Sequence, residues 1–171
     1  GWDKGEAPLG YGERDVETEL SFGGDEDEKH TVAYFRKTFT VESPQDWLEY
    51  ALVLRYDDGA AIFVNGREIA RLNIDKDEEL TEKTFATSTT RSEMNFHYVR
   101  VPKDAIKEGE NVLAISIHQA NATSSDTILD AEFIADQGAK TLDDDPKDVA
   151  ALMERQKKVK DVLPDLEKAT V

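Results

Sequence analysis

Apolar and polar residues alternate along several separate stretches of this chain, which is the pattern of strands with one buried face. The clearest example runs from Thr31 to Val41, where Ala33, Phe35 and Phe39 fall on one face with Val41. Similar patterns predict strands over residues 47–56, 96–101, 111–119 and 127–135, and a short strand near residues 16–22. Turn-forming residues separate these stretches, as short connections between strands require.

The strongest local signal is the dipeptide Asn65-Gly66, which lies between an apolar run at residues 60–64 and a second run at residues 67–72. A type I′ turn needs positive φ at both central residues, and Asn-Gly meets that need best. The sequence therefore predicts a β-hairpin here, with Asp57-Asp58-Gly59 as the turn that precedes it.

At least seven predicted strands, with turn signals between them, indicate an all-β fold. We expect an antiparallel jelly-roll β-sandwich for residues 1–137, because no alternation of strands and helices suggests a parallel sheet. Residues 73–92 are polar and irregular and predict a long loop, which in a compact domain is usually functional or disordered.

Residues 138–171 follow a different pattern, which predicts a linker and an amphipathic α-helical extension. Asp145-Pro146 is a capped helix start, and apolar residues recur at helical spacing up to Pro164. Such a helix could pack on the sandwich, lead into a neighbouring domain or bind a partner, and the sequence leaves these alternatives open.

Charge narrows the classes of partner. The net charge is −16, and almost all of it falls in residues 1–137, because residues 138–171 hold eight acidic and seven basic side chains. A field of this sign repels phosphate backbones, so we expect no nucleic-acid binding. It also disfavours sulfated or uronic polysaccharides as ligands unless cations intervene.

The chain contains no cysteine, which excludes disulfides, thiolate metal sites and cysteine nucleophiles. No apolar run approaches the roughly 20 residues that span a bilayer, so we expect no membrane span. The sequence begins with Gly1 and Trp2. We expect a piece of a larger secreted protein, extracellular or periplasmic, whose signal peptide is not in this sequence.

Several motifs occur in an order that resembles a known family. They are Trp2 followed by Pro8-Leu9-Gly10-Tyr11-Gly12, then Tyr34-Phe35-Arg36-Lys37-Thr38-Phe39, Asp57-Asp58-Gly59-Ala60 with Val64-Asn65-Gly66, Glu108-Gly109-Glu110-Asn111-Val112-Leu113-Ala114, and His118-Gln119. Together they resemble the galactose-binding-like jelly-roll modules, such as the sugar-binding domain of β-galactosidase and β-glucuronidase and accessory modules of secreted bacterial hydrolases. The resemblance covers about residues 2–135 and leaves the predicted helix unexplained.

The resemblance implies a non-catalytic module. Many members of this family bind carbohydrate at loops on one edge or face of the sandwich, often with a structural calcium ion, so a neutral carbohydrate is the expected partner. Many others only position a catalytic neighbour. The alternative function is therefore a structural or docking module that binds no sugar and packs against an adjacent domain of the same polypeptide, such as a hydrolase or phosphoesterase domain.

Calcium would bind to clustered oxygen ligands. Asp57 and Asp58 are adjacent carboxylates before a glycine, a pair that also resembles the calcium-holding aspartates of protective-antigen-type adhesin domains. Asp126 is the third candidate ligand. The simpler interpretation of Asp57-Asp58 is a turn before the hairpin.

The loop that follows the strand at residues 111–119 is the candidate for ligand binding. His118, Asn121, Ser124 and Ser125 supply a ring, an amide and hydroxyls that can bond to sugar hydroxyls, and rigidly carried loops are where binding residues concentrate. The simpler interpretation is a turn whose side chains satisfy backbone amides. Ser, His and Asp also make up a hydrolytic triad, but nothing here indicates a nucleophile elbow or an oxyanion hole.

Trp47 is the aromatic candidate, because an exposed indole can stack on the apolar face of a pyranose ring. It comes just after a loop and begins a strand, so a place in the core or at its rim is the simpler interpretation. The acidic loop at residues 75–79 is not an EF-hand, since Leu80 and Ala86 stand where that motif needs glycine and glutamate. Three scattered histidines do not support a zinc site.

Overall fold

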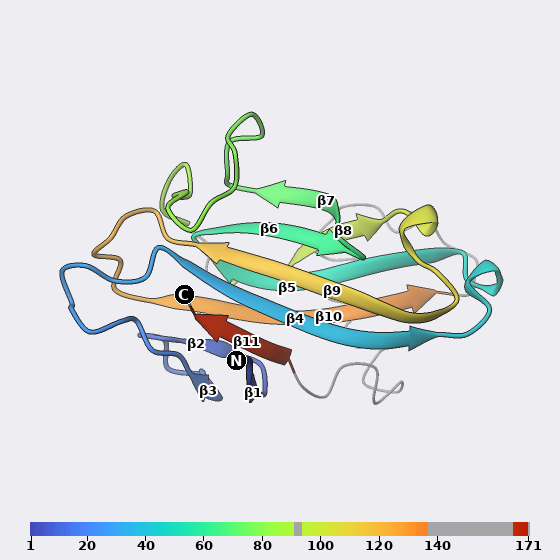
Figure 1. The fold of residues 1–171 in the computed structure, drawn as a ribbon, viewed down its shortest axis with the longest axis horizontal. Helices are drawn as coiled ribbons and strands as arrows, with labels where there is room; N and C mark the ends of the chain where they lie inside the picture. The colour runs from blue at the N-terminus through green and yellow to red at the C-terminus, as the bar shows by residue number, and fades with distance from the viewer. Residues whose placement is uncertain (91–93, 137–165, 171) are drawn as a thin grey trace.

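The computed structural model describes residues 1–90, 94–136 and 166–170. Two packed β-sheets form a sandwich, as Figure 1 shows. The strands are β1 (Asp3–Gly5), β2 (Leu9–Tyr11), β3 (Thr18–Glu19), β4 (Val32–Val41), β5 (Glu49–Asp57), β6 (Gly59–Val64), β7 (Arg67–Leu72), β8 (His97–Val101), β9 (Gly109–His118), β10 (Thr127–Asp136) and β11 (Leu166–Thr170). Two short 3₁₀ turns, η1 (Pro44–Asp46) and η2 (Lys103–Ala105), complete the described elements.

One sheet has six strands in the order β1-β11-β4-β9-β6-β7, and the other has five in the order β3-β2-β10-β5-β8. All pairings are antiparallel except the short parallel contact of β2 with β3. The predicted all-β sandwich is therefore confirmed. Among the described residues no helix is long and apolar enough to cross a membrane.

The core lies between the two sheets, where alternate residues of each strand meet. Phe35 and Phe39 of β4, together with Leu113 of β9, face Leu52 of β5 and Phe133 of β10, and all are at least nine-tenths buried. The rings of Phe39 and Phe133 pack against each other at an interplanar angle of 40°, with their centroids 4.6 Å apart. The alternation in the sequence therefore identified the inward face of each long strand.

β5 is buried on both faces. Its sequence Tyr50-Ala51-Leu52-Val53-Leu54 fits this position, because a strand that is covered on both sides needs a continuous apolar run. Ala51 and Val53, at 1% and 0% exposed, belong to a second small apolar cluster on the opposite face from the main core. Pairing with β10 on one side and β8 on the other, together with double burial, makes β5 a rigid support for the residues at its end.

The N-terminal arm is more regular than the sequence pattern indicated, because β1 and β2 add one strand to each sheet. Gly10 of β2 pairs with Ile128 of β10, and a Cβ at this position would overlap the carbonyl oxygen of Thr127. Leu9 is fully buried beside it. The Pro-Leu-Gly-Tyr-Gly motif thus has a packing reason, since only glycine permits this approach.

The central hairpin is confirmed. β6 pairs with β7, and Asn65 and Gly66 have φ of 52° and 80°, as a type I′ turn requires. The predicted helix lies outside the described residues. β11 comes from the segment that the sequence pattern separated from the sandwich, yet it lies between β1 and β4 in the six-stranded sheet.

Asn111 fastens this hairpin turn to the connection before β9. Its side chain is fully buried; its Oδ1 accepts from Asn65 Nδ2 at 2.8 Å and from the Lys107 amide at 3.0 Å. Its Nδ2 donates to the carbonyls of Lys107 at 2.8 Å and Gly109 at 2.9 Å. Every hydrogen-bonding position of a buried amide is therefore used.

Replacing Asn111 with alanine should lower the free energy of unfolding by about 2–4 kcal/mol, because four hydrogen bonds are lost and buried polar groups lose their partners. Denaturant unfolding monitored by tryptophan fluorescence measures this loss. The exposed Asn95→Ala is the matched control and should change stability by less than about 0.5 kcal/mol. A loss for Asn111→Ala as small as that of the control would contradict the fastening role.

Candidate functional site

The chain passes from the five-stranded sheet to the six-stranded sheet at one end of the sandwich. β5 ends at Asp57 and β6 begins at Gly59, so Asp58 alone makes the crossing; the Asp57–Asp58 peptide bond is cis. The β9–β10 loop and the long loop after β7 lie at this same end, on the left of Figure 1. Segments far apart in the sequence therefore meet here.

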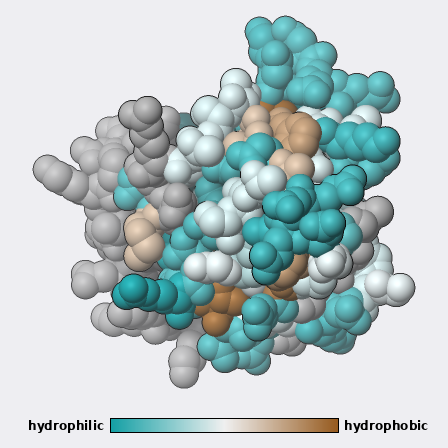
Figure 2. Space-filling view, turned by 90° about the vertical axis from the view of Figure 1, so that its left-hand side faces the viewer, coloured by the Kyte–Doolittle hydropathy of each residue, from teal (hydrophilic) through white to brown (hydrophobic). Residues whose placement is uncertain are grey.

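A hollow of about 320 Å³ opens at this end. Its lining is polar throughout and comes from three parts of the chain: Asp57, Asp58, Thr89, Asn121, Thr123, Ser124, Ser125 and Asp126. Figure 2 views the molecule from this end, and hydrophilic and intermediate residues cover most of the surface there. The structure thus brings the three predicted calcium ligands together with three of the predicted sugar-binding residues.

Asp58 makes several hydrogen bonds in the wall of the hollow and is only 3% exposed. Its Oδ1 accepts from the backbone amide of Thr90 at 2.8 Å, and its Oδ2 accepts from that of Ala120 at 2.9 Å. Its carbonyl oxygen accepts from Thr90 Oγ1 at 2.6 Å and from Asn73 Nδ2 at 2.9 Å. One residue therefore contacts both loops that enclose the hollow.

Asp57 is the last residue of β5, and Asp126 immediately precedes β10, the strand that pairs with β5. Asp57 is 2% exposed, and its carbonyl oxygen accepts from Thr127 Oγ1 at 3.1 Å. Asp126 is half-buried, and its Oδ1 accepts from the Ser125 hydroxyl at 3.0 Å. The hollow therefore has a carboxylate at its rim as well as carboxylates in its wall.

The β9–β10 loop also satisfies its own backbone, as the simpler interpretation required. Asn121 Oδ1 accepts from the amide and the hydroxyl of Thr123, both at 2.9 Å. Lys29 Nζ donates to the Ser124 carbonyl at 2.7 Å and lies 5.3 Å from the centroid of the Tyr11 ring and 5.2 Å from that of Phe22. The ammonium group of Lys29 therefore supports the loop at Ser124, whereas no basic residue lines the hollow.

Tyr11 lies close under the hollow. Burial raises its pKa to about 12, and the charges of Asp126, Asp57 and Asp58 contribute in the same direction. Its hydroxyl accepts from Gln119 Nε2 at 2.9 Å, and the same Nε2 donates to the Asp126 carbonyl at 3.2 Å. The phenol is therefore neutral near pH 7 and supports the loop rather than carrying charge.

His118, a predicted ligand-binding residue, is not among the residues that line the hollow. The side chain is fully buried; its Nδ1 lies 2.7 Å from the Thr84 carbonyl and its Nε2 lies 2.8 Å from Ser116 Oγ. Both ring nitrogens are used inside the protein, and burial is the main cause that lowers the His118 pKa. The ring fastens the long loop to the outer side of β9.

The distance between Ser116 and His118 equals that of a nucleophile and its base, yet neither can meet a substrate, because they are 5% and 0% exposed. His118 Nδ1 faces a backbone carbonyl in place of the carboxylate of a triad. The pair is therefore structural.

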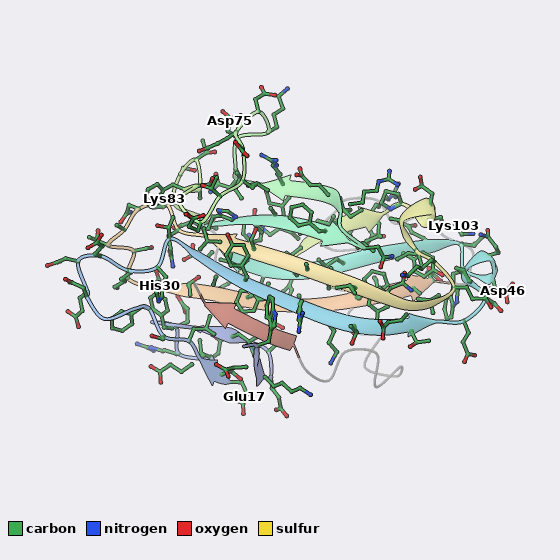
Figure 3. All side chains as sticks on the ribbon, viewed as in Figure 1. Glu17, His30, Asp46, Asp75, Lys83 and Lys103 are labelled. Carbon is green, nitrogen blue, oxygen red and sulfur yellow. The ribbon has the colours of Figure 1, made fainter. Side chains whose placement is uncertain are left out.

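Trp47 lies far from the hollow. It precedes β5, whose nine residues at about 3.3 Å each put it roughly 30 Å from Asp57, and its neighbour Asp46 is labelled at the opposite end in Figure 3. The half-buried indole packs against the main core. The sequence alone could not show this, because a residue at the start of a strand and a residue at its end are equally near a loop.

Thr89 and Thr123 complete the lining. Thr89 was not predicted, and the only signal for it was its position in the long polar loop. The acidic tip of that loop lies away from the hollow, since Asp75 projects from the sandwich in Figure 3. There Arg71 donates to the carbonyls of Asp75 and Glu78, at 2.9 and 2.6 Å, and the tip is exposed.

Calcium fits this hollow in the chemistry of its donors, which are carboxylate, amide and hydroxyl oxygens. Within the described residues, however, no three acidic or histidine side chains gather closely enough to hold a metal ion. A bound calcium ion would therefore take two carboxylates at most and would depend on the amide oxygen of Asn121 and on hydroxyl oxygens.

No protein-family model matches the chain, and no curated protein matches it. Three solved α-L-rhamnosidase structures are similar to part of it. The one from Streptomyces avermitilis, complexed with L-rhamnose, is 22% identical with a TM-score of 0.44, over 67% of this chain and 10% of that chain. Those from Dictyoglumus thermophilum and Aspergillus terreus are 13% and 12% identical with TM-scores of 0.40 and 0.39, each over 63% of this chain and 12% of the other. The chain thus spans about a tenth of the length of these enzymes.

Stability should fall on acidification below about pH 6.5. Burial lowers the folded-state pKa of His118 and of His97 below the ordinary 6.5, so the unfolded chain binds more protons and each pH unit costs at most about 1.4 kcal/mol per histidine. Denaturant unfolding at pH 7.5 and pH 5.5 measures the slope. His118→Gln and His97→Gln should each remove part of it, and a wild-type protein equally stable at both pH values would contradict this prediction.

Proposed function

We propose that this chain is a non-catalytic carbohydrate-binding module of a larger secreted protein, and that a neutral sugar binds in the hollow at the end of the sandwich. One observation carries the proposal: three distant parts of the chain bring only polar side chains to a single hollow. Ligand sites are mostly apolar with a few polar groups. A wholly polar site therefore suits a ligand that is rich in hydroxyl groups.

Charge supports a neutral ligand. Carboxylates line the hollow and no basic residue lines it, so an anionic sugar would be repelled. Carboxylates accept hydrogen bonds only, whereas hydroxyls both donate and accept. The vicinal hydroxyls of a neutral sugar can donate to Asp57 and Asp126 and exchange hydrogen bonds with Ser124 and Ser125.

The docking alternative would be favoured by a continuous apolar patch. Among the described residues the exposed large apolar side chains are Trp2, Leu48, Phe85 and Met94. Trp2 precedes β1, Leu48 lies just before β5, and Phe85 and Met94 lie in the connection between β7 and β8. Arg36 lies over the Trp2 ring at 4.3 Å. Scattered single residues of this kind are normal on a soluble surface. The hollow is therefore the better basis for a function.

The sugar site is tested by titrating the protein with D-galactose, D-glucose, D-mannose and L-rhamnose, followed by calorimetry and amide chemical shifts. We expect shifts confined to residues 57–58, 89–90 and 120–126. Asp126→Asn and Asn121→Ala should weaken binding about tenfold, the loss of roughly 1.4 kcal/mol of hydrogen bonding. Asp46→Asn, at the opposite end of the sandwich, is the matched control. Binding that these site variants leave unchanged would place the ligand elsewhere, and no binding by any sugar would refute the proposal.

The structural calcium ion is a separate part of the proposal, with Asp57, Asp126 and Asn121 as the residues that would hold it. A ligand that binds only the folded state raises the stability, by about 2.7 kcal/mol at a hundredfold excess over its dissociation constant. Calcium chloride should therefore raise the melting temperature, and a chelator should reverse the rise. Asp57→Asn should abolish the rise while the control Asp46→Asn keeps it. A melting temperature indifferent to calcium would exclude this ion from the site.

A further inference from the structure

Asp58 occupies a place in the hollow that the other lining residues do not share. It makes the crossing between the two sheets, and its backbone amide donates to the His118 carbonyl at 3.3 Å. Its position is therefore set by the ends of β5, β6 and β9, which are the rigid parts of the sandwich.

The two carboxylate oxygens of Asp58 are directed to two different loops. Thr90, which donates its amide to Oδ1, directly follows the lining residue Thr89. Ala120, which donates its amide to Oδ2, directly precedes the lining residue Asn121. Each hydrogen bond thus fixes the backbone one residue away from a side chain that lines the hollow.

We propose that Asp58 is the positioning residue of the hollow, and that its carboxylate sets the separation between Thr89 and Asn121 before a ligand arrives. This inference rests on the proposed sugar site for its functional meaning. Fixing loops in the binding geometry removes the entropy cost that ligand binding would otherwise bear. Asp58 therefore raises the affinity for the ligand by fixing the backbone of both loops, in addition to its own direct contact with the ligand.

The carboxylate suits this role better than a neutral group. Hydrogen bonds from backbone amides to an ionised carboxylate are shorter and about twice as strong as bonds between neutral groups. An asparagine would keep one acceptor and turn an N–H group toward the second amide, and a glutamate would keep the charge but move it outward by one methylene. The two replacements therefore separate geometry from charge.

The test is amide hydrogen exchange by NMR on the full chain. Asp58→Asn and Asp58→Glu should each speed exchange at Thr90 or Ala120 at least tenfold relative to the core strand amides of Leu52 and Ile115. Asp75→Asn is the matched control, because Asp75 Oδ1 accepts the amide of Asp77 at 2.9 Å, within the tip of the same long loop and away from the hollow. It should leave Thr90 and Ala120 unchanged. Uniform acceleration of all amides, or none, would overturn the positioning role.

The second measurement links this role to binding. With the same four sugars, Asp58→Glu should weaken any binding seen in the wild type at least tenfold, although it retains the charge, whereas Asp75→Asn should not. Unchanged affinity for Asp58→Glu would overturn the inference. If the wild type binds none of the sugars, the proposed function fails, and the exchange experiment still decides whether Asp58 holds the two loops.

Discussion

The structure depends on a crossing between its two sheets that is one residue long. β5 lies between β10 and β8 in the five-stranded sheet, β6 lies in the six-stranded sheet, and only Asp58 separates them. A Cβ on Gly59 would lie 2.9 Å from Ala86 and from Ile74, so glycine is required for the long loop to pack against the crossing. The short crossing places a buried carboxylate where a polar loop can close over it, and this produces the hollow.

The two ends of the sandwich differ in structure. At one end the buried amide of Asn111 connects the hairpin turn to the start of β9 through four hydrogen bonds, and every position of that amide is used within the protein. At the other end the β9–β10 loop and the long loop after β7 contribute side chains that line the hollow.

Buried polar groups also hold the long loop after β7 in place. His118 bonds to the Thr84 carbonyl and to Ser116, and Ala86 donates its amide to the Gln119 carbonyl at 2.9 Å. These contacts hold the loop against the outer side of β9. The loop is irregular in conformation, yet it is fixed at several points, so the residues near Thr89 have a defined place next to the β9–β10 loop.

The sequence determined the strands, the hairpin and the polar character of the loops, because alternation and Asn-Gly turn chemistry are local properties. It also pointed to Asp57, Asp58, Asn121, Ser124, Ser125 and Asp126, all of which line the hollow, since polar residues next to turns are visible in the pattern. Only the tertiary structure decided that His118 points into the protein, that Trp47 lies at the far end, that Thr89 joins the site, and that β11 enters the six-stranded sheet. These features depend on which strand ends and loops meet in space, and that is set by the strand order. The turn signal at residues 57–59 marks the crossing but does not show which loops meet there.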